Sequence, residues 1–105
     1  QESGYECAKK LLAQKPDAIF VASDFMAMGA MQAIQEAGLS IPKDIAIVSF
    51  DDIPQAEELS LSTVHQPTRE IGEMAVDIIL KKINDPDSEV YQAVLPPYLV
   101  HRKTS

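Results

Sequence analysis

The chain has 105 residues, which is room for one domain, and its apolar fraction of 46% is ordinary for a globular protein. The formal net charge is −7 and no basic stripe is present, which excludes a surface that binds the phosphate backbone of a nucleic acid within this chain. A lone Cys7 excludes an internal disulfide and is typical of a reducing compartment. No apolar run reaches transmembrane length. No signal peptide is seen, but the chain begins at Gln1 without a Met, so we expect sequence upstream of it.

Helical and strand patterns alternate along the first half of the chain. Apolar residues recur at helical spacing over 4–12 and 25–37. The run 18–22 is short and wholly apolar, as in a parallel strand buried on both faces, and 45–50 is similar. Between them, Ser23-Asp24 offers an N-cap to the second helix. This order of elements predicts a parallel α/β sheet with right-handed crossovers.

The second half continues the alternation. A helical turn is expected at 54–58 and a third strand at 61–65. The clearest amphipathic helix runs from Thr68 to about Asn84. A last strand is expected over 92–100, where two prolines make its middle a bend or an edge. The fold class is therefore α/β, a parallel sheet flanked by helices.

Polar side chains follow three of the predicted strands, as Ser23-Asp24, Asp51-Asp52 and Gln66. The C-terminal ends of parallel strands meet at one edge of a sheet, where ligands bind. Carboxylate and amide groups suit the hydroxyl or ring N–H groups of a small polar ligand. A purely structural explanation also exists for each, since Asp24 can cap a helix and Asp52 can begin a turn. Their shared location favours a ligand role most for Asp51.

Metal binding and nucleophilic catalysis are the chemical alternatives. The aspartates could hold a divalent metal, as carboxylates do in phosphoacceptor sites. Such a site needs a Lys at the end of a later strand, but His65-Gln66 is found at that position, which disfavours this alternative. Cys7 is distant in sequence from either histidine, and neither a Gly-x-Ser-x-Gly turn nor a Gly-rich phosphate loop is present. His65 is interpreted as a strand-end residue and 101–103 as a solvated basic tail. We therefore predict no metal, no cofactor and no enzymatic activity.

The helix at 25–37 has more apolar surface than one buried face requires. Phe25, Met28 and Gln32 lie on a second stripe at helical spacing. Large apolar residues on an outer stripe indicate a partner surface. The alternative is that Met28 is a further core residue.

Several segments of the chain resemble the lactose/galactose repressor family of bacterial transcription regulators. The match runs over almost the whole chain, in order and at the family's spacing. Its most specific parts are Ala22-Ser23-Asp24-Phe25-Met26-Ala27-Met28-Gly29-Ala30, Phe50-Asp51-Asp52, Ser62-Thr63-Val64-His65-Gln66-Pro67 and Leu95-Pro96-Pro97-Tyr98-Leu99-Val100-His101-Arg102-Lys103. The resemblance implies the C-terminal part of a periplasmic-binding-protein-like (type I) effector domain. That core has two α/β subdomains with the effector in the cleft between them.

The resemblance also implies a domain assignment and a site. Residues 1–66 would belong to the C-terminal subdomain, 67–92 would supply a helix to the N-terminal subdomain, and 93–105 would form the final strand and tail. Three residues align with effector contacts of the family: Ser23, Asp51 and Gln66. The family often has Asn at the position of Ser23. The Ser side chain is shorter and lacks the amide, so the ligand is not expected to bind here in the same orientation as in relatives.

The implied partners are a small-molecule effector (a sugar, a nucleobase or similar), a second copy of the chain, and operator DNA only through a domain absent from this chain. The homodimer would use the helical stripe and the turn after Asp52, through Phe25, Met28, Gln32, Gln55 and Leu59. Such a repressor works in the cytoplasm and does not contact the membrane. The alternative is a periplasmic solute-binding protein of a transporter, which shares the core. The ending at 95–103 resembles repressors more.

Overall fold

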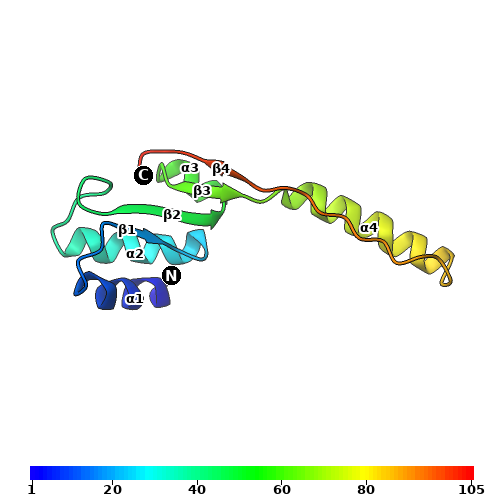
Figure 1. Cartoon of the computed structure of the whole chain (residues 1–105), viewed down its shortest axis with the longest axis horizontal. Coiled ribbons are helices and arrows are strands. Elements are labelled where there is room, and N and C mark those ends of the chain that lie inside the picture. The colour runs from blue at the N-terminus through cyan, green and yellow to red at the C-terminus, as the bar shows by residue number, and fades with distance from the viewer. The chain divides into compact units, whose positions relative to one another are not determined.

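Eight helices and strands follow one another along the chain, and a computed structural model describes all of residues 1–105 (Figure 1). They are α1 (Glu2–Leu12), β1 (Ala18–Phe20), α2 (Asp24–Glu36), β2 (Ala46–Asp51), α3 (Pro54–Glu58), β3 (Ser62–His65), α4 (Thr68–Asn84) and β4 (Tyr98–Val100). All four predicted helices are present, and their ends lie within two residues of the predicted ones. The predicted α/β class is confirmed.

The chain divides into two compact units. Residues 1–65 and 98–105 form the first unit, which holds the whole sheet, and residues 66–97 form the second, which holds α4. The chain therefore passes between the units twice, after His65 and before Tyr98.

The sheet of the first unit has the strand order β1-β2-β3-β4. β1 and β2 are parallel, with Ala18 opposite Ala46, and β2 and β3 are parallel as well. β4 differs from the prediction because it pairs antiparallel to β3, which makes the sheet mixed. Its direction has a simple cause. The chain leaves the sheet at His65 and returns at Tyr98, which lies directly opposite in the ladder, so β4 must run back along β3.

Two predicted strands are shorter than expected. β1 ends at Phe20, and only its central residue Ile19 is buried, while Phe20 is 66% exposed. Burial on both faces was thus a wrong expectation for β1, because it is the end strand of the sheet and one of its faces lacks cover. The last strand is limited to Tyr98–Val100 rather than 92–100. Proline has no N–H for a ladder, so Pro96 and Pro97 keep the preceding residues out of the sheet.

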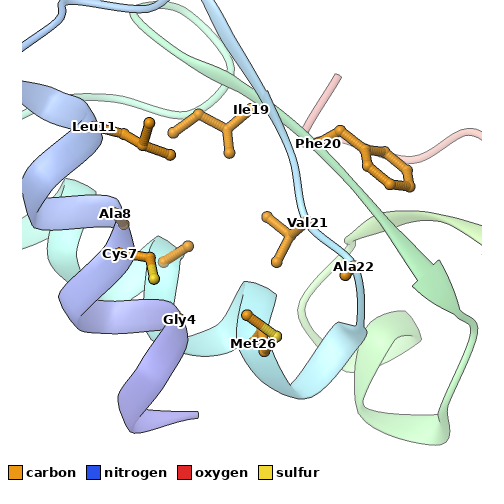
Figure 2. A pocket seen from close by; sticks show the side chains of 10 residues that line it. Gly4, Cys7, Ala8, Leu11, Ile19, Phe20, Val21, Ala22 and Met26 are labelled. Carbon is orange, nitrogen blue, oxygen red and sulfur yellow. The ribbon is translucent and has the colours of Figure 1, made fainter.

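The core of the first unit lies where α2 packs against the sheet. Small residues bring α2 close to the strands, and aliphatic side chains fill the space between: Ala27, Ala30, Ala33, Ile34, Ile19, Ile45, Ile47 and Leu61. α1 packs on α2 (Figure 1), and the Tyr5 hydroxyl donates to Glu36 Oε2 at 2.5 Å. Figure 2 shows an apolar groove of about 220 Å³ beside α1, with side chains of Leu11 and Val21 around it.

The second unit is built on α4, which has no buried residue. Five of its large apolar side chains are exposed: Ile71, Val76, Ile79, Leu80 and Ile83. The segment 91–95 and α4 line a groove of about 600 Å³ within this unit. No helix of the chain has the length and apolar content needed to cross a membrane.

Candidate functional site

Ser23 and Asp51 lie at the same edge of the sheet, at the C-terminal ends of neighbouring parallel strands. Phe20 of β1 is opposite Val48 of β2 in the ladder. Ser23 lies three positions after Phe20, and Asp51 lies three positions after Val48. Both side chains are half-buried. The Ser23 hydroxyl caps α2 by accepting from the backbone N–H of Met26 at 3.3 Å. Topology therefore brings together two of the three predicted ligand residues at the edge where α/β sheets bind ligands.

The backbone after β2 has an unusual conformation. Asp51 has φ 125° and Asp52 has φ 61°, so two successive non-glycine residues lie in the positive-φ region. Such conformations are costly for residues with a side chain and persist only where surrounding contacts hold them. We call this feature the Asp51-Asp52 bend. It sets the direction in which the backbone presents Asp51 at the sheet edge.

Asp24 has a role that the sequence prediction missed. The pair Ser23-Asp24 was expected to supply the cap of α2; Ser23 is that cap, and Asp24 is fully buried as the first helical residue. One carboxylate oxygen accepts from the Ser49 hydroxyl and, at 2.6 Å, from the Thr63 hydroxyl. The other accepts from the backbone N–H of Ile53 at 2.9 Å. A buried carboxylate needs such partners, because burying it unpaired would be very costly.

Two basic side chains flank Asp52. One carboxylate oxygen is 2.8 Å from His65 Nδ1, and the other accepts from Arg102 Nη2 at 2.9 Å. Arg102 is mostly buried and also donates from Nη1 to the Leu61 carbonyl at 2.8 Å. The expectation that 101–103 is a solvated tail is thus wrong for Arg102. Sequence position could not reveal its partner, which lies 50 residues earlier.

The environment of Asp52 favours its charged form. Burial alone would raise the pKa of this carboxyl, but the hydrogen bonds from His65 and Arg102, together with their charges, outweigh burial and lower the pKa of Asp52. The His65 ring stacks on Tyr98, with 4.8 Å between ring centroids. His65 is indeed the last residue of β3, as predicted, and it also joins β4 to the Asp51-Asp52 bend.

The final residues of the chain are held against the sheet. The Thr104 hydroxyl donates to the Ile47 carbonyl and accepts from the Ser62 N–H, both at 2.8 Å. The Ser105 hydroxyl donates to the Ser62 hydroxyl at 2.7 Å. The tail therefore stabilises β2 and β3 near their N-terminal ends, away from the C-terminal edge at which Ser23 and Asp51 lie.

The remaining predicted site residues are placed as follows. Gln66 is half-buried and begins the second unit, so its part in a shared site stays a prediction. On α2, Phe25 is 54% exposed, Met28 is half-buried, and the exposed Gln32 amide donates to Glu36 Oε1 at 2.9 Å. Gln55 and Leu59, in and after α3, are exposed. Their role in an interface also stays a prediction.

This α/β sheet, with polar groups at its C-terminal edge, is the architecture of a ligand-binding domain, and the family described as "Periplasmic binding protein-like domain" matches residues 1–105. The lactose operon repressor of Rhizobium radiobacter is 48% identical over 99% of this chain and 95% of its own length. The ribose operon repressor of Escherichia coli K12 is 37% identical over 94% of this chain. The chain belongs to the lactose/galactose repressor family. The relatives named here are operon repressors rather than transport proteins, which favours the regulator over the transporter alternative.

Solved structures agree with this assignment. A LacI family transcriptional regulator from Enterococcus faecalis V583, with bound ribose, has a TM-score of 0.95, 28% identity and coverage of 99% of this chain. The lac repressor dimer bound to operator and an anti-inducer has a TM-score of 0.86 and 35% identity. The chain spans 40% and 37% of these two proteins, and 31% of the Escherichia coli ribose operon repressor.

Proposed function

We propose that this chain is the C-terminal part of the effector-sensing domain of a DNA-binding transcription repressor. The observation that carries the proposal is the position of Asp51, which the Asp51-Asp52 bend presents beside Ser23 at the C-terminal edge of the sheet. Two half-buried polar side chains at such an edge are suited to a small polar ligand.

The ligand class we propose is a sugar or another polyhydroxylated or N–H-bearing small molecule. The Asp51 carboxylate would accept from ligand hydroxyls, and the Ser23 hydroxyl would contribute one further polar contact. Gln66, directly after β3, would be a third polar contact, as the family resemblance implies. Two relatives of known structure support the sugar class, one with bound ribose and one, a transcriptional regulator, in complex with cellobiose.

Effector binding would act by shifting an equilibrium between two arrangements of the subdomains. In this proposal residues 1–66 belong to the C-terminal subdomain, 67–92 to the N-terminal subdomain, and 93–105 return as the final strand and tail. A ligand that contacts both subdomains stabilises the arrangement in which both contacts are made. The exposed apolar side chains of α4 support its packing against chain outside these 105 residues.

The repressor would act as a homodimer. Phe25, Met28 and Gln32 of α2, with Gln55 and Leu59, would meet the same residues of a second copy across a two-fold axis. The exposure of Phe25 and Leu59 supports this surface. Operator DNA would be bound through a separate domain, in the cytoplasm, and no reaction would be catalysed.

The upstream coding sequence tests this function. A repressor must have a DNA-binding domain such as a helix-turn-helix before residue 1, and a mobility-shift assay with the full-length protein should show binding to DNA from its own promoter region. A signal peptide at that position, with no binding to this DNA, would instead identify a transport protein.

A further inference from the structure

We propose that Asp24 is a positioning residue for the ligand site, because its carboxylate holds the Asp51-Asp52 bend at both ends. The inference rests on the proposed ligand role of Asp51. It assigns to Asp24 no contact with the ligand.

The hydrogen bonds of Asp24 enclose the bend. Ser49, two residues before Asp51, donates its hydroxyl to Oδ1, and Ile53, directly after Asp52, donates its backbone N–H to Oδ2. The same carboxylate therefore binds the chain on each side of the two positive-φ residues. Thr63 donates to Oδ1 as well, which joins the neighbouring strand β3 to the same group.

The backbone conformation explains why such a group is needed. Asp51 and Asp52 have side chains, so their positive φ values are disfavoured and would relax if the flanking residues were free to move. Asp24 is at the first position of α2, directly after the cap Ser23, and is fully buried. Asp24 therefore holds the bend at a fixed position relative to α2 and to Ser23, the other predicted ligand residue.

Helix capping does not account for the carboxylate at this position, because the Ser23 hydroxyl already accepts from Met26. Burying a carboxylate is costly, and the partners that offset this cost are drawn from β2, from β3 and from the segment after the bend. The arrangement fixes the position of the bend relative to β2, to β3 and to the start of α2, beside the edge where the ligand is proposed to bind.

A double-mutant cycle tests the proposal in the full-length protein. Asp24→Asn keeps the volume but replaces one acceptor oxygen with a donor and removes the charge. We expect it to weaken sugar binding by roughly tenfold, within the range of coupling between neighbouring groups. D-ribose, lactose and cellobiose, titrated by calorimetry, are the probes. The loss should be absent when Asp24→Asn is added to Asp51→Ala.

A merely structural role would lower the stability of the protein without changing the affinity of the folded fraction. An electrostatic effect on the ligand itself would persist in the Asp51→Ala background. Either an unchanged affinity in Asp24→Asn or an equal loss in both backgrounds would overturn the proposal. Ser49→Ala, which removes a single donor before the bend, repeats the cycle with a smaller change and has the same expected direction.

Amide hydrogen exchange separates this inference from the proposed function. Asp24→Asn should speed exchange at the Ile53 N–H, while the Val21 N–H, which donates to the Val48 carbonyl at 2.9 Å, keeps its protection. If the wild-type protein binds none of the three sugars, the proposed function fails for that class and the exchange result alone decides. Unchanged exchange at Ile53 would overturn the role of Asp24.

Discussion

The guanidinium of Arg102 donates to the carboxylate of Asp52 across 2.9 Å, which joins the end of the chain to the bend after β2. A second guanidinium nitrogen donates to the Leu61 carbonyl, at the start of β3. Two donors of one planar group therefore connect the tail with the residue before β3 and with the bend after β2. Both side chains of the ion pair are mostly buried, so solvent screens the pair only weakly.

Removal of this guanidinium should destabilise the fold. Arg102→Ala leaves Asp52 with only one of its two side-chain partners and removes the donor to Leu61, so we expect the free energy of unfolding to fall by about 2–3 kcal/mol. Urea unfolding of the full-length protein measures it. The neighbouring exposed Lys103→Ala is the matched control and should change stability by less than about 0.5 kcal/mol. Equal effects of the two substitutions would show that the ion pair contributes nothing.

Acid should weaken the protein partly through Asp52. The pKa of Asp52 is lowered in the folded state, so its contribution to stability is present above the ordinary aspartate value of about 3.9 and is lost as the pH falls through the lower folded value. The urea midpoint of the wild type should therefore fall more steeply below about pH 4 than that of Asp52→Asn. Asp17→Asn, at an exposed loop position, should keep the wild-type slope. Parallel curves for wild type and Asp52→Asn would contradict the prediction.

Substitution by alanine should change the stability of the protein in opposite directions at two helical glycines. A Cβ on Gly29 of α2 would lie 2.0 Å from the carbonyl oxygen of Gln1 and 2.8 Å from the backbone nitrogen of Tyr5. Both are backbone atoms, so α1 must move away, and Gly29→Ala should cost about 1–3 kcal/mol. A Cβ on Gly72 of α4 meets nothing within 4 Å, and Gly72→Ala should stabilise by up to about 1 kcal/mol through helix propensity. Thermal unfolding of both variants checks the pair, and a stabilising Gly29→Ala would disprove the close packing of α1 on α2.

The proposed homodimer is tested on α2. Met28→Glu would bring like charges together near the two-fold axis, where burial makes them costly, so the dimer should dissociate at concentrations where the wild type is dimeric. Sedimentation velocity of the full-length protein measures this. Ala13→Glu, exposed after α1, is the control and should leave the dimer intact. An undiminished Met28→Glu dimer would exclude this stripe as the interface.

The periodic features of the fold could be predicted from the sequence, because apolar spacing reports local structure directly. The helix from Thr68 to Asn84 matches its predicted bounds, and the first three strands pair in parallel as expected. The direction of β4 was not predictable in the same way. It depends on His65 and Tyr98 lying opposite one another, although 33 positions separate them in the chain.

The parts of the site that sequence reasoning missed are long-range. Asp24 follows Ser23, which is the cap of α2. The partners that explain its burial are the hydroxyl groups of Ser49 and Thr63 on later strands. Their proximity to Asp24 depends on the register of the strands, which the sequence does not report. Arg102 lies in a short basic run that looks like a solvated end. Its partner Asp52 becomes evident only once β4 returns beside β3.

The sheet edge at Asp51 is proposed to bind a small polar effector, and calorimetric titration of the full-length protein with D-ribose, lactose and cellobiose measures that binding. At least one sugar should bind to the wild type. A carboxylate that accepts from ligand hydroxyls contributes about 1.5–3 kcal/mol, so Asp51→Ala should weaken that binding by roughly 10- to 100-fold. Asp17→Ala should bind like the wild type. Unchanged affinity in Asp51→Ala would show that this edge of the sheet is not the ligand site.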